Sequence, residues 1–259
     1  MIAPPRLDAP VVLVHGLSGF SRLVPRRRAA VKDYFPGIRP FFEAGGNRVL
    51  SPQVTPTASV STRAFELRTV LRRELGSQPF HIIGHSQGGL DARYMISRLG
   101  MEDQVLSLTT VGTPHRGTTL ADWGILWWSR YVCPILRRAG IPDRAFFELT
   151  TESCRLFNES TPDAPGVRYF SIAGICAEHW LNAGWRMTSR IVGRVEGVND
   201  GVVSVASATW GERTDIGAGD HLTLDNWPNR RMNRAGESTD RTADYGRILD
   251  QLLKVSRPD

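Results

Sequence analysis

The sequence predicts a protein of the α/β class, built on a mostly parallel central sheet flanked by helices. Short apolar runs alternate with segments of helical periodicity, which is typical of parallel βαβ units. The first run, residues 11–15, is a continuous β-branched stretch ending in histidine, as expected of a strand buried on both faces. The length of 259 residues fits one large domain better than two, so we expect a single domain over residues 1–259.

The other elements follow from the same patterns. We expect strands over residues 48–54, 80–84, 105–111 and 167–173, and a helix over 87–99. Between residues 60 and 75, apolar residues recur at helical spacing and predict an amphipathic helix, with Arg63, Arg68 and Arg72 on its polar side. The last helix has one apolar face, and Ser238 or Thr239 is its expected N-cap.

The alternation is interrupted between about residues 118 and 165. Helical patterns rich in tryptophan replace the βα units there, and such insertions usually lie over the ligand-binding end of an α/β sheet. The large apolar residues of this insertion are Trp123, Ile125, Leu126, Trp127, Trp128, Tyr131, Val132, Ile135 and Leu136.

The charge pattern argues against a nucleic-acid partner. The net charge is +6, and Lys32 and Lys254 are the only lysines, so nearly all basic residues are arginines. These arginines are scattered, and no nucleic-acid-binding motif accompanies them. A solvated surface explains them most simply, and a preference for anionic membranes is the alternative.

The cysteines and the N-terminus favour a cytoplasmic location. Cys133, Cys154 and Cys176 are odd in number and far apart, which predicts neither a disulfide framework nor a zinc site. No basic segment followed by an apolar run marks a signal peptide, and no apolar stretch is long enough to span a membrane. A leader removed beforehand would change the expectation to secretion.

A candidate nucleophile lies between a predicted strand and a predicted helix. The segment GHSQG at 84–88 matches Gly-x-Ser-x-Gly, the nucleophile elbow of the α/β-hydrolase fold. The elbow holds a serine on a strained turn, and Gly84 and Gly88 leave room for that turn. Ser86 is therefore the expected nucleophile, with the N-terminus of the next helix favouring negative charge beside it.

Serine needs a base, and the order of the triad in this fold is serine, acid, histidine. His179 and His221 follow the serine with room for an acid before them, and we favour His221. Asp200, in a short turn before an apolar run, is the expected acid that orients the imidazole. Asp215 and Asp220 compete for that role.

The oxyanion of an acyl-transfer intermediate requires two backbone donors. We expect them to be the N–H groups of Gln87, which follows the serine, and Leu17, which follows the first strand. His15 is expected to order that loop through a hydrogen bond. His85 and His115 receive similar structural interpretations.

Seven blocks of sequence carry a more specific resemblance. They are PVVLVHGLSGF at 10–20, SPQVTPTASVSTRA at 51–64, GHSQGGLDARY at 84–94, TTVGTPHRGTTLADW at 109–123, PGVRYFSIAG at 165–174, NDGVVSVASATWG at 199–211 and DHL at 220–222. With these blocks in order, the chain resembles the bacterial triacylglycerol lipases related to the Pseudomonas and Burkholderia enzymes.

The resemblance implies an α/β-hydrolase with Ser86, Asp200 and His221 as triad, and with Leu17 and Gln87 as oxyanion donors. It also implies that the insertion over 118–165 is a lid, which would contact a membrane or lipid droplet; simple core packing is the alternative. The implied substrate is a lipid or a small acyl ester.

The chain also departs from this family. Many of its members bind a structural calcium through an aspartate two residues after the catalytic histidine, where this chain has Thr223. Asp225 is nearby but out of register, so we expect no cofactor and no metal, and a structural calcium is the alternative. Ala206 stands where a cysteine of the disulfide found in some relatives is expected.

Three functions are consistent with these observations. The first is a lipase that cleaves acylglycerols, and the second is a carboxylesterase that cleaves soluble short-chain esters with the same triad. The third is a non-catalytic binding protein of the same fold, whose mark would be a broken triad, and no triad position is broken here.

Overall fold

The structure is a computed structural model of the chain, and it describes residues 4–17, 33–127, 130–131, 133–138 and 143–255. Its centre is a six-stranded sheet in the order β2-β1-β3-β4-β5-β6, and every neighbouring pair is parallel. The strands are β1 (Val11–Val14), β2 (Val49–Leu50), β3 (Phe80–His85), β4 (Val105–Val111), β5 (Arg168–Ile175) and β6 (Arg213–Ala218). The expected parallel sheet is thus confirmed.

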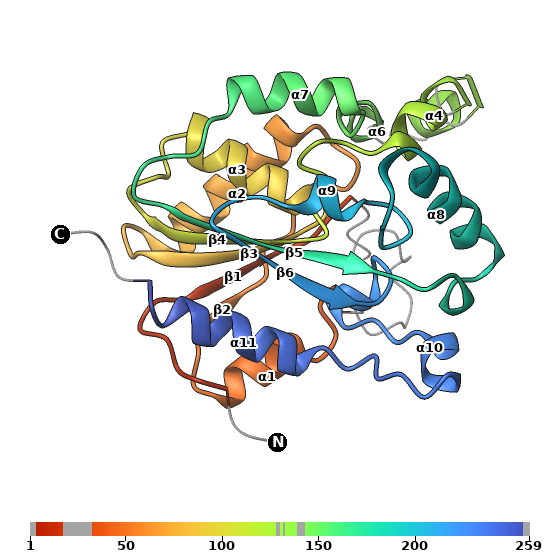
Figure 1. Ribbon diagram of the computed structural model, residues 1–259. Helices are drawn as coiled ribbons and strands as arrows, with labels where there is room; N and C mark the ends of the chain where they lie inside the picture. The colour runs from red at the N-terminus through yellow and green to blue at the C-terminus, as the bar shows by residue number, and fades with distance from the viewer. Residues whose placement is uncertain (1–3, 18–32, 128–129, 132, 139–142, 256–259) are drawn as a thin grey trace.

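Helices cover both faces of the sheet (Figure 1). α2 (Val60–Leu75) and α3 (Gln87–Arg98) lie on one face, and α1 (Ile38–Ala44) and α11 (Thr242–Leu252) lie on the other. Alternate residues of β1 supply the two cores, because successive side chains of a strand point to opposite faces. Val12 packs in the cluster that contains Leu67 of α2, whereas Val11 packs in the cluster that contains Leu249 of α11.

The insertion between β4 and β5 is helical, as expected. It contains α4 (Thr119–Trp127), α5 (Cys133–Arg138), α6 (Arg144–Glu148) and α7 (Thr151–Ser160). Trp123 is 63% exposed and Tyr131 is 52% exposed, so these two rings are not core residues. Trp128, Val132 and the side chains of Leu126, Trp127, Ile135 and Leu136 lie outside the described residues. The lid therefore stays a prediction.

The remaining elements follow the last two strands. η2 (Glu178–Trp180), α8 (Ala183–Glu196) and α9 (Val205–Ala208) come between β5 and β6. η3 (Thr223–Asp225) and α10 (Arg230–Arg234) come between β6 and α11. In Figure 1, α4 and α8 lie at the end of the molecule toward which the arrows of β5 and β6 point.

Two predicted boundaries are wrong. β2 is confined to Val49–Leu50 instead of extending to residue 54, because the amide of Val54 donates to Nε2 of His15 at 3.2 Å and the chain leaves the sheet. The N-cap of α11 is Arg241, neither Ser238 nor Thr239. The Arg241 amide instead donates to Oδ1 of Asn226 at 2.6 Å.

Arg63 is also misplaced by the sequence pattern, which put it on the polar side of its helix. Its side chain is fully buried, and its Nε donates to Oδ2 of Asp91 at 2.7 Å. Nη2 of Arg63 donates to the carbonyl of His15 at 2.7 Å. The guanidinium therefore joins α2, α3 and the loop after β1, a tertiary contact that helical periodicity does not reveal.

The three cysteines are free, and Cys133 and Cys154 are buried. Within the described ranges, no helix combines the length and the apolarity that crossing a bilayer requires.

Candidate active site

Ser86 occupies a strained turn between β3 and α3. Its φ of 52° and ψ of −128° are rare for a residue with a side chain and cost on the order of 1–3 kcal/mol. The Ser86 amide donates to the carbonyl of Val111 at 2.9 Å, which anchors the turn to β4. The strand, turn and helix expected around this serine are therefore present.

Two glycines make the turn sterically feasible. A Cβ on Gly84 would lie 2.9 Å from the amide nitrogen of Gly89, and a Cβ on Gly88 would lie 2.6 Å from the carbonyl oxygen of Val14. Both contacts are with backbone atoms, which cannot move aside. Any larger residue at 84 or 88 would push α3 away from the sheet.

Asp200 and His221 are brought together at the carboxyl edge of the sheet. His221 Nδ1 lies 2.7 Å from Oδ2 of Asp200, and both residues are buried. The other carboxylate oxygen accepts hydrogen bonds from the amides of Val202 and Val203 at 2.9 and 2.8 Å. This geometry fixes the ring so that Nε2 is the nitrogen free to act as a base.

The electrostatics of His221 suit that role. Burial by itself lowers the pKa of His221. The charge of Asp200 and its hydrogen bond together raise this pKa by more than burial lowers it, so the net pKa lies above 6.5. The imidazolium that forms during proton transfer is thereby stabilised.

The loop after β1 lies against the serine. A Cβ on Gly16 would come within 2.8 Å of Cβ of Ser86, so this position must remain a glycine. His15 Nδ1 lies 2.8 Å from the carbonyl of Gly16, and its Nε2 accepts the Val54 amide. Leu17 follows directly, and Gln87 is the first residue of α3, where an N–H has no partner within the helix.

The competing residues lie apart from this pair. Asp215 pairs with exposed Arg213 on β6 at 2.8 Å. Oδ1 of Asp220 accepts the amides of Leu222 and Thr223 in its own loop. His179 is exposed, and its ring packs edge-on against Trp180.

A second acid–imidazole pair lies beneath the first, and sequence reasoning missed it. Asp225 and His85 are both buried, with Oδ2 of Asp225 2.7 Å from Nδ1 of His85. His85 Nε2 donates to the carbonyl of His221 at 3.0 Å, and the two rings lie 4.6 Å apart. The hydroxyls of Tyr34 and Tyr245 also contact this pair, at 2.9 Å from His85 Nδ1 and 3.3 Å from Asp225 Oδ1.

Burial shifts the pKa values of this second pair in opposite directions. It raises the pKa of Asp225 well above the ordinary range and lowers the pKa of His85. Both directions favour a neutral pair, with a protonated Asp225 beside a neutral His85. Because His85 precedes Ser86 and holds the backbone of His221, this pair joins the serine turn to the histidine loop.

The calcium site of the resembled family does not fit these residues. Thr223 is buried and its Oγ1 donates to Oδ1 of Asp220 at 2.9 Å, while Nδ2 of Asn229 donates to Oδ2 at 2.6 Å. Oδ1 of Asp225 accepts the Tyr245 hydroxyl, and its Oδ2 lies 2.7 Å from Nδ1 of His85. Among the described residues, no three histidine, cysteine or acidic side chains group as metal ligands would.

An apolar pocket of about 170 Å³ opens beside the candidate oxyanion loop. Its walls come from Leu17, from the loop after Asp200, and from α4 and α6. The lining residues are Leu17, Thr118, Leu120, Ala121, Ile125, Phe146, Phe147, Leu149 and Val202. A lining with this character suits a hydrocarbon chain.

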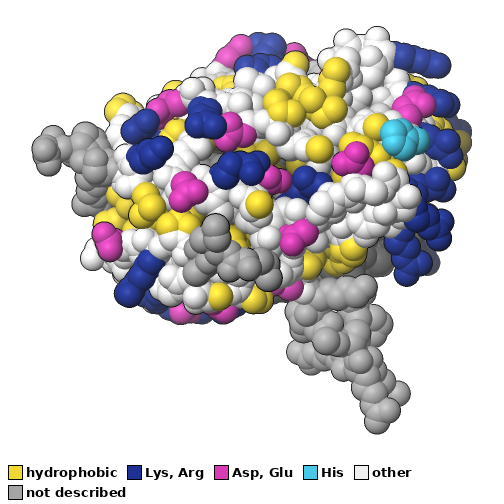
Figure 2. Space-filling view, turned by 60° about the horizontal axis from the view of Figure 1, so that its bottom comes forward, with side chains coloured by type: hydrophobic (Ala, Val, Ile, Leu, Met, Phe, Trp, Pro, Cys, Tyr) yellow, Lys and Arg dark blue, Asp and Glu magenta, His cyan; other side chains and the backbone are white. Residues whose placement is uncertain are grey.

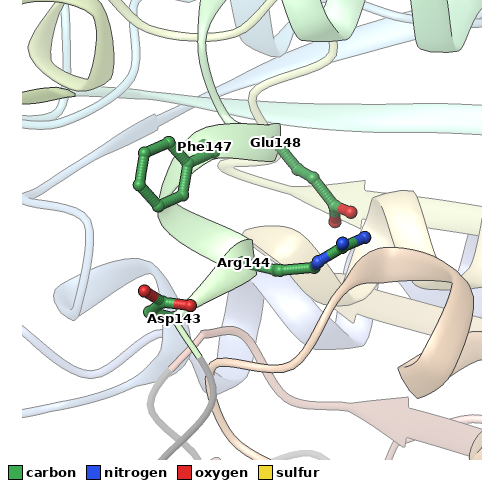
Figure 3. A pocket seen from close by; sticks show the side chains of 4 residues that line it. All are labelled: Asp143, Arg144, Phe147 and Glu148. Atoms are coloured by element: carbon green, nitrogen blue, oxygen red, sulfur yellow. The ribbon is translucent and has the colours of Figure 1, made fainter. Parts of the chain in front are cut away.

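A second, larger hollow of about 550 Å³ lies at α6 and is lined by Asp143, Arg144, Phe147 and Glu148. Figure 3 shows the Arg144 and Glu148 side chains extending to the same side, whereas the Phe147 ring points away from them. Phe147 also lines the apolar pocket, so α6 separates a charged hollow from an apolar one.

Known proteins resemble this chain over part or most of its length. Residues 10–130 match the family described as palmitoyl protein thioesterase. A triacylglycerol lipase of Burkholderia plantarii is 36% identical over 44% of this chain and 32% of its own length, so the chain spans about a third of that relative.

Solved structures resemble the whole chain at low sequence identity and therefore speak for the fold alone. Staphylococcus hyicus lipase superposes with a TM-score of 0.72 at 19% identity, covering 97% of each chain. The metagenomic carboxyl esterase MGS0156 superposes with a TM-score of 0.73 at 18% identity, covering 98% of this chain and 77% of its own. Together with the parallel sheet, they identify the expected α/β-hydrolase fold.

One relative extends through most of both sequences. Triacylglycerol lipase 2 of Saccharomyces cerevisiae is 31% identical over 86% of this chain and 74% of its own length. The chain therefore belongs to the triacylglycerol lipase family, and it is a lipase-like carboxylic ester hydrolase.

Proposed function

We propose that the chain hydrolyses acyl esters through an acyl-enzyme on Ser86, with His221 as base and Asp200 as the acid that orients it. The observation that carries this proposal is the buried 2.7 Å contact between Asp200 and His221, set beside the strained turn at Ser86. A serine becomes a useful nucleophile only when a positioned base accepts its proton.

The reaction follows from these positions. Nε2 of His221 accepts the Ser86 hydroxyl proton as Oγ bonds to the ester carbonyl carbon, and the N–H groups of Leu17 and Gln87 stabilise the oxyanion. His221 then returns the proton to the alcohol oxygen, the ester C–O bond breaks, and the alcohol leaves. Water, deprotonated by His221, releases the acyl group as a carboxylic acid and restores Ser86.

The apolar pocket supports an acyl chain as the group held next to the serine. Leu17 lines this pocket and is also the proposed oxyanion donor, so a carbonyl bound there would direct its hydrocarbon chain along α4 and α6. The names of the relatives favour acylglycerols as substrates, in line with the yeast and bacterial triacylglycerol lipases. In this proposal the helices over 118–165 act as the lid, and exposed Trp123 contacts a membrane or lipid droplet.

The size of the pocket favours a second candidate, a short-chain carboxylesterase. A volume of about 170 Å³ accommodates roughly six water-sized groups, since each occupies about 30 Å³ in the liquid. This space seats the first carbons of an acyl chain, and a long chain would need room beyond the described walls.

Ser86→Ala tests the nucleophile. We expect kcat to fall by about 10⁶-fold, because loss of the serine removes the covalent step, while the melting temperature stays within a few degrees. Ser61→Ala, an exposed serine on α2, is the matched control and should keep wild-type turnover. Near-normal hydrolysis by the Ser86 variant would reject the proposal and favour a different site.

Substrate length separates the two candidates. Hydrolysis of p-nitrophenyl butyrate and palmitate is compared with and without detergent micelles. A lipase should cleave the palmitate ester and accelerate above its solubility limit. A preference for butyrate with no such acceleration would assign the carboxylesterase instead.

A further inference from the structure

The inner face of α8 supports the loop that carries Asp200. Oγ1 of Thr188 donates to the carbonyl of Gly201 at 2.7 Å, and Nδ2 of Asn199 donates to the carbonyl of Ser189 at 3.1 Å. Glu196 accepts the hydroxyl of Ser204 at 2.6 Å. The position of α8 is therefore coupled to the position of the candidate acid.

The outer face of α8 carries two parallel stripes. Arginines recur every four residues in one stripe, and large apolar residues recur every four residues in the next, so each stripe runs along the helix. The arginine stripe is Arg186, Arg190 and Arg194, and the apolar stripe is Met187, Ile191 and Val195. Met187 is 56% exposed and Val195 is 71% exposed, so the apolar stripe faces outward instead of packing in the core.

The positive charge extends from α8 to α10. Exposed Arg230, Arg231 and Arg234 lie on α10, which contacts η2 next to α8. Figure 2 shows Lys and Arg side chains gathered along the edge of the molecule that carries α8 and α10 in Figure 1.

Few acidic groups offset this charge. On η2 and α8 the acidic residues are Glu178 and Glu196, and the exposed acids Glu237 and Asp240 follow α10. Glu178 pairs with Arg190 at 2.9 Å, whereas Glu196 is turned inward to accept the Thr119 amide at 2.6 Å. The surface therefore keeps a positive excess.

The same surface continues to the apolar pocket. α4 is a direct neighbour of α8, and it supplies Leu120, Ala121 and Ile125 to the pocket. Trp123, on the same helix, is 63% exposed, and a tryptophan at such a position is typical of a membrane interface.

We propose that the outer face of α8, extended by the arginines of α10, docks the protein on an anionic phospholipid surface. An amphipathic helix with arginines beside apolar residues lies in a bilayer interface, where the apolar stripe enters the acyl boundary and the arginines meet lipid phosphates. A nucleic acid would use the arginines but offer nothing to Met187 and Val195. This inference rests on the proposed function, because docking here turns the apolar pocket toward ester-bearing lipids.

Vesicle co-sedimentation of the full chain carrying Ser86→Ala tests this surface without hydrolysing the lipid. We expect binding to vesicles that contain phosphatidylglycerol and little binding to pure phosphatidylcholine. Each arginine near an anionic surface contributes about fivefold to partitioning, so Arg186→Gln, Arg190→Gln and Arg194→Gln together should weaken binding on the order of 10²-fold. Met187→Ser with Val195→Ser should weaken it about tenfold.

A matched control removes the same charge elsewhere. Arg72, Arg73 and Arg98 are exposed near the carboxyl ends of α2 and α3, and their replacement by glutamine should leave vesicle binding within about twofold. Equal loss in this control, or equal binding to both kinds of vesicle, overturns the proposal. Undiminished binding by the Met187 and Val195 variant would also overturn it and indicate a general polyanion site.

Salt and hydrolysis provide independent readouts. Added salt should weaken vesicle binding by the chain with an intact α8, because exposed charges are screened; salt-independent binding contradicts an anionic docking surface. Ester hydrolysis is measured separately on the chain with Ser86 intact. Failure of vesicle binding with hydrolysis preserved rejects only this inference, whereas loss of both rejects the proposed function.

Discussion

Two buried acid–imidazole pairs organise the candidate site at the scale of single residues, and they hold their protons differently. In the first pair, Asp200 raises the pKa of His221 above its ordinary value. In the second pair, burial raises the pKa of Asp225 and lowers the pKa of His85, which favours a neutral pair. The first is suited to accept a proton during a reaction, and the second is suited to hold a fixed geometry.

The first pair predicts a particular pH dependence. His221 can act as a base only when it is neutral, so kcat/KM should fall as pH decreases through its raised pKa, above 6.5. Asp200→Asn removes the main cause of that elevation, so the acidic limb should move to lower pH. It should also reduce kcat by about 10⁴-fold.

Asp215→Asn is the matched control for this prediction. Asp215 pairs with Arg213 on the exposed edge strand, so its replacement should leave both the limb and kcat unchanged. If the acidic limb of the pH profile stays in place in the Asp200 variant, Asp200 is not the acid that raises the pKa of His221. The measurement is a pH series of kcat/KM on a soluble nitrophenyl ester.

The second pair predicts that the protein tolerates replacement of Asp225 by asparagine. In Asp225→Asn, a neutral amide replaces the protonated carboxyl beside His85 and can accept the Tyr245 hydroxyl, so stability and kcat/KM should stay near wild type. Asp225→Ala leaves the Tyr245 hydroxyl without its acceptor and removes the carboxyl next to His85, so it should lower the free energy of unfolding by about 1–3 kcal/mol. It should also reduce kcat/KM by about 10- to 10²-fold, because the histidine loop shifts.

Comparison of the two variants identifies the proton position. If Asn is as damaging as Ala in thermal melts and in kcat/KM, the pair is ionic and the neutral assignment is wrong.

At the scale of elements, the junction between β3 and α3 depends on close approach of the backbone. Gly88→Ala would place a Cβ 2.6 Å from the carbonyl oxygen of Val14 on β1, so α3 must separate from the sheet. We expect a loss of at least 1–3 kcal/mol in unfolding free energy and loss of turnover. Gly184→Ala on α8 is the control, because its Cβ meets only Asn182 at 3.5 Å and alanine favours helix.

Denaturant unfolding and esterase assays of these two variants check the prediction. A Gly88 variant that unfolds at the wild-type midpoint and retains turnover would mean that the elbow is not tightly packed.

The elements predicted well from sequence are those whose pattern reflects the core directly. The strands β1, β3 and β4 are continuous apolar or β-branched runs, and they lie where the sequence indicated. β6 was not predicted, because it is an edge strand with mixed burial and Ile216 is half exposed. α8 was not predicted either, since its apolar residues occupy the outer face as well as the inner one.

At the scale of the whole molecule, the candidate site is assembled from segments distant in sequence. The loop after β1, the turn after β3, the loop after α8 and the loop after β6 meet at the carboxyl edge of the parallel sheet. The contact of Asp200 with His221 and the turn at Ser86 could be predicted, because each residue lies in a short loop with the order that this fold requires; their catalytic roles stay a prediction. The contact of Asp225 with His85 could not, because nothing local links residues 140 positions apart.

The histidine loop is held in place by contacts with distant parts of the chain. Hydrogen bonds tie it to distant segments: Nδ2 of Asn226 donates to the carbonyl of Pro36 at 2.7 Å, and Nε1 of Trp227 donates to the carbonyl of Tyr34 at 2.8 Å. Within the loop, Asn229 and Thr223 occupy both oxygens of Asp220. The oxygen atoms that calcium would need are already engaged.

We therefore expect calcium removal to have no effect. EDTA should leave the melting temperature and kcat unchanged, and added calcium should not raise either. A structural ion present at 100 times its Kd would stabilise the fold by about 2.7 kcal/mol, a difference that thermal melts resolve easily. Asn229→Ala should instead cost about 1 kcal/mol by leaving Oδ2 of the partly buried Asp220 carboxylate without its donor, and calcium should not restore it. A drop in melting temperature with EDTA that calcium reverses would show that the loop binds an ion after all.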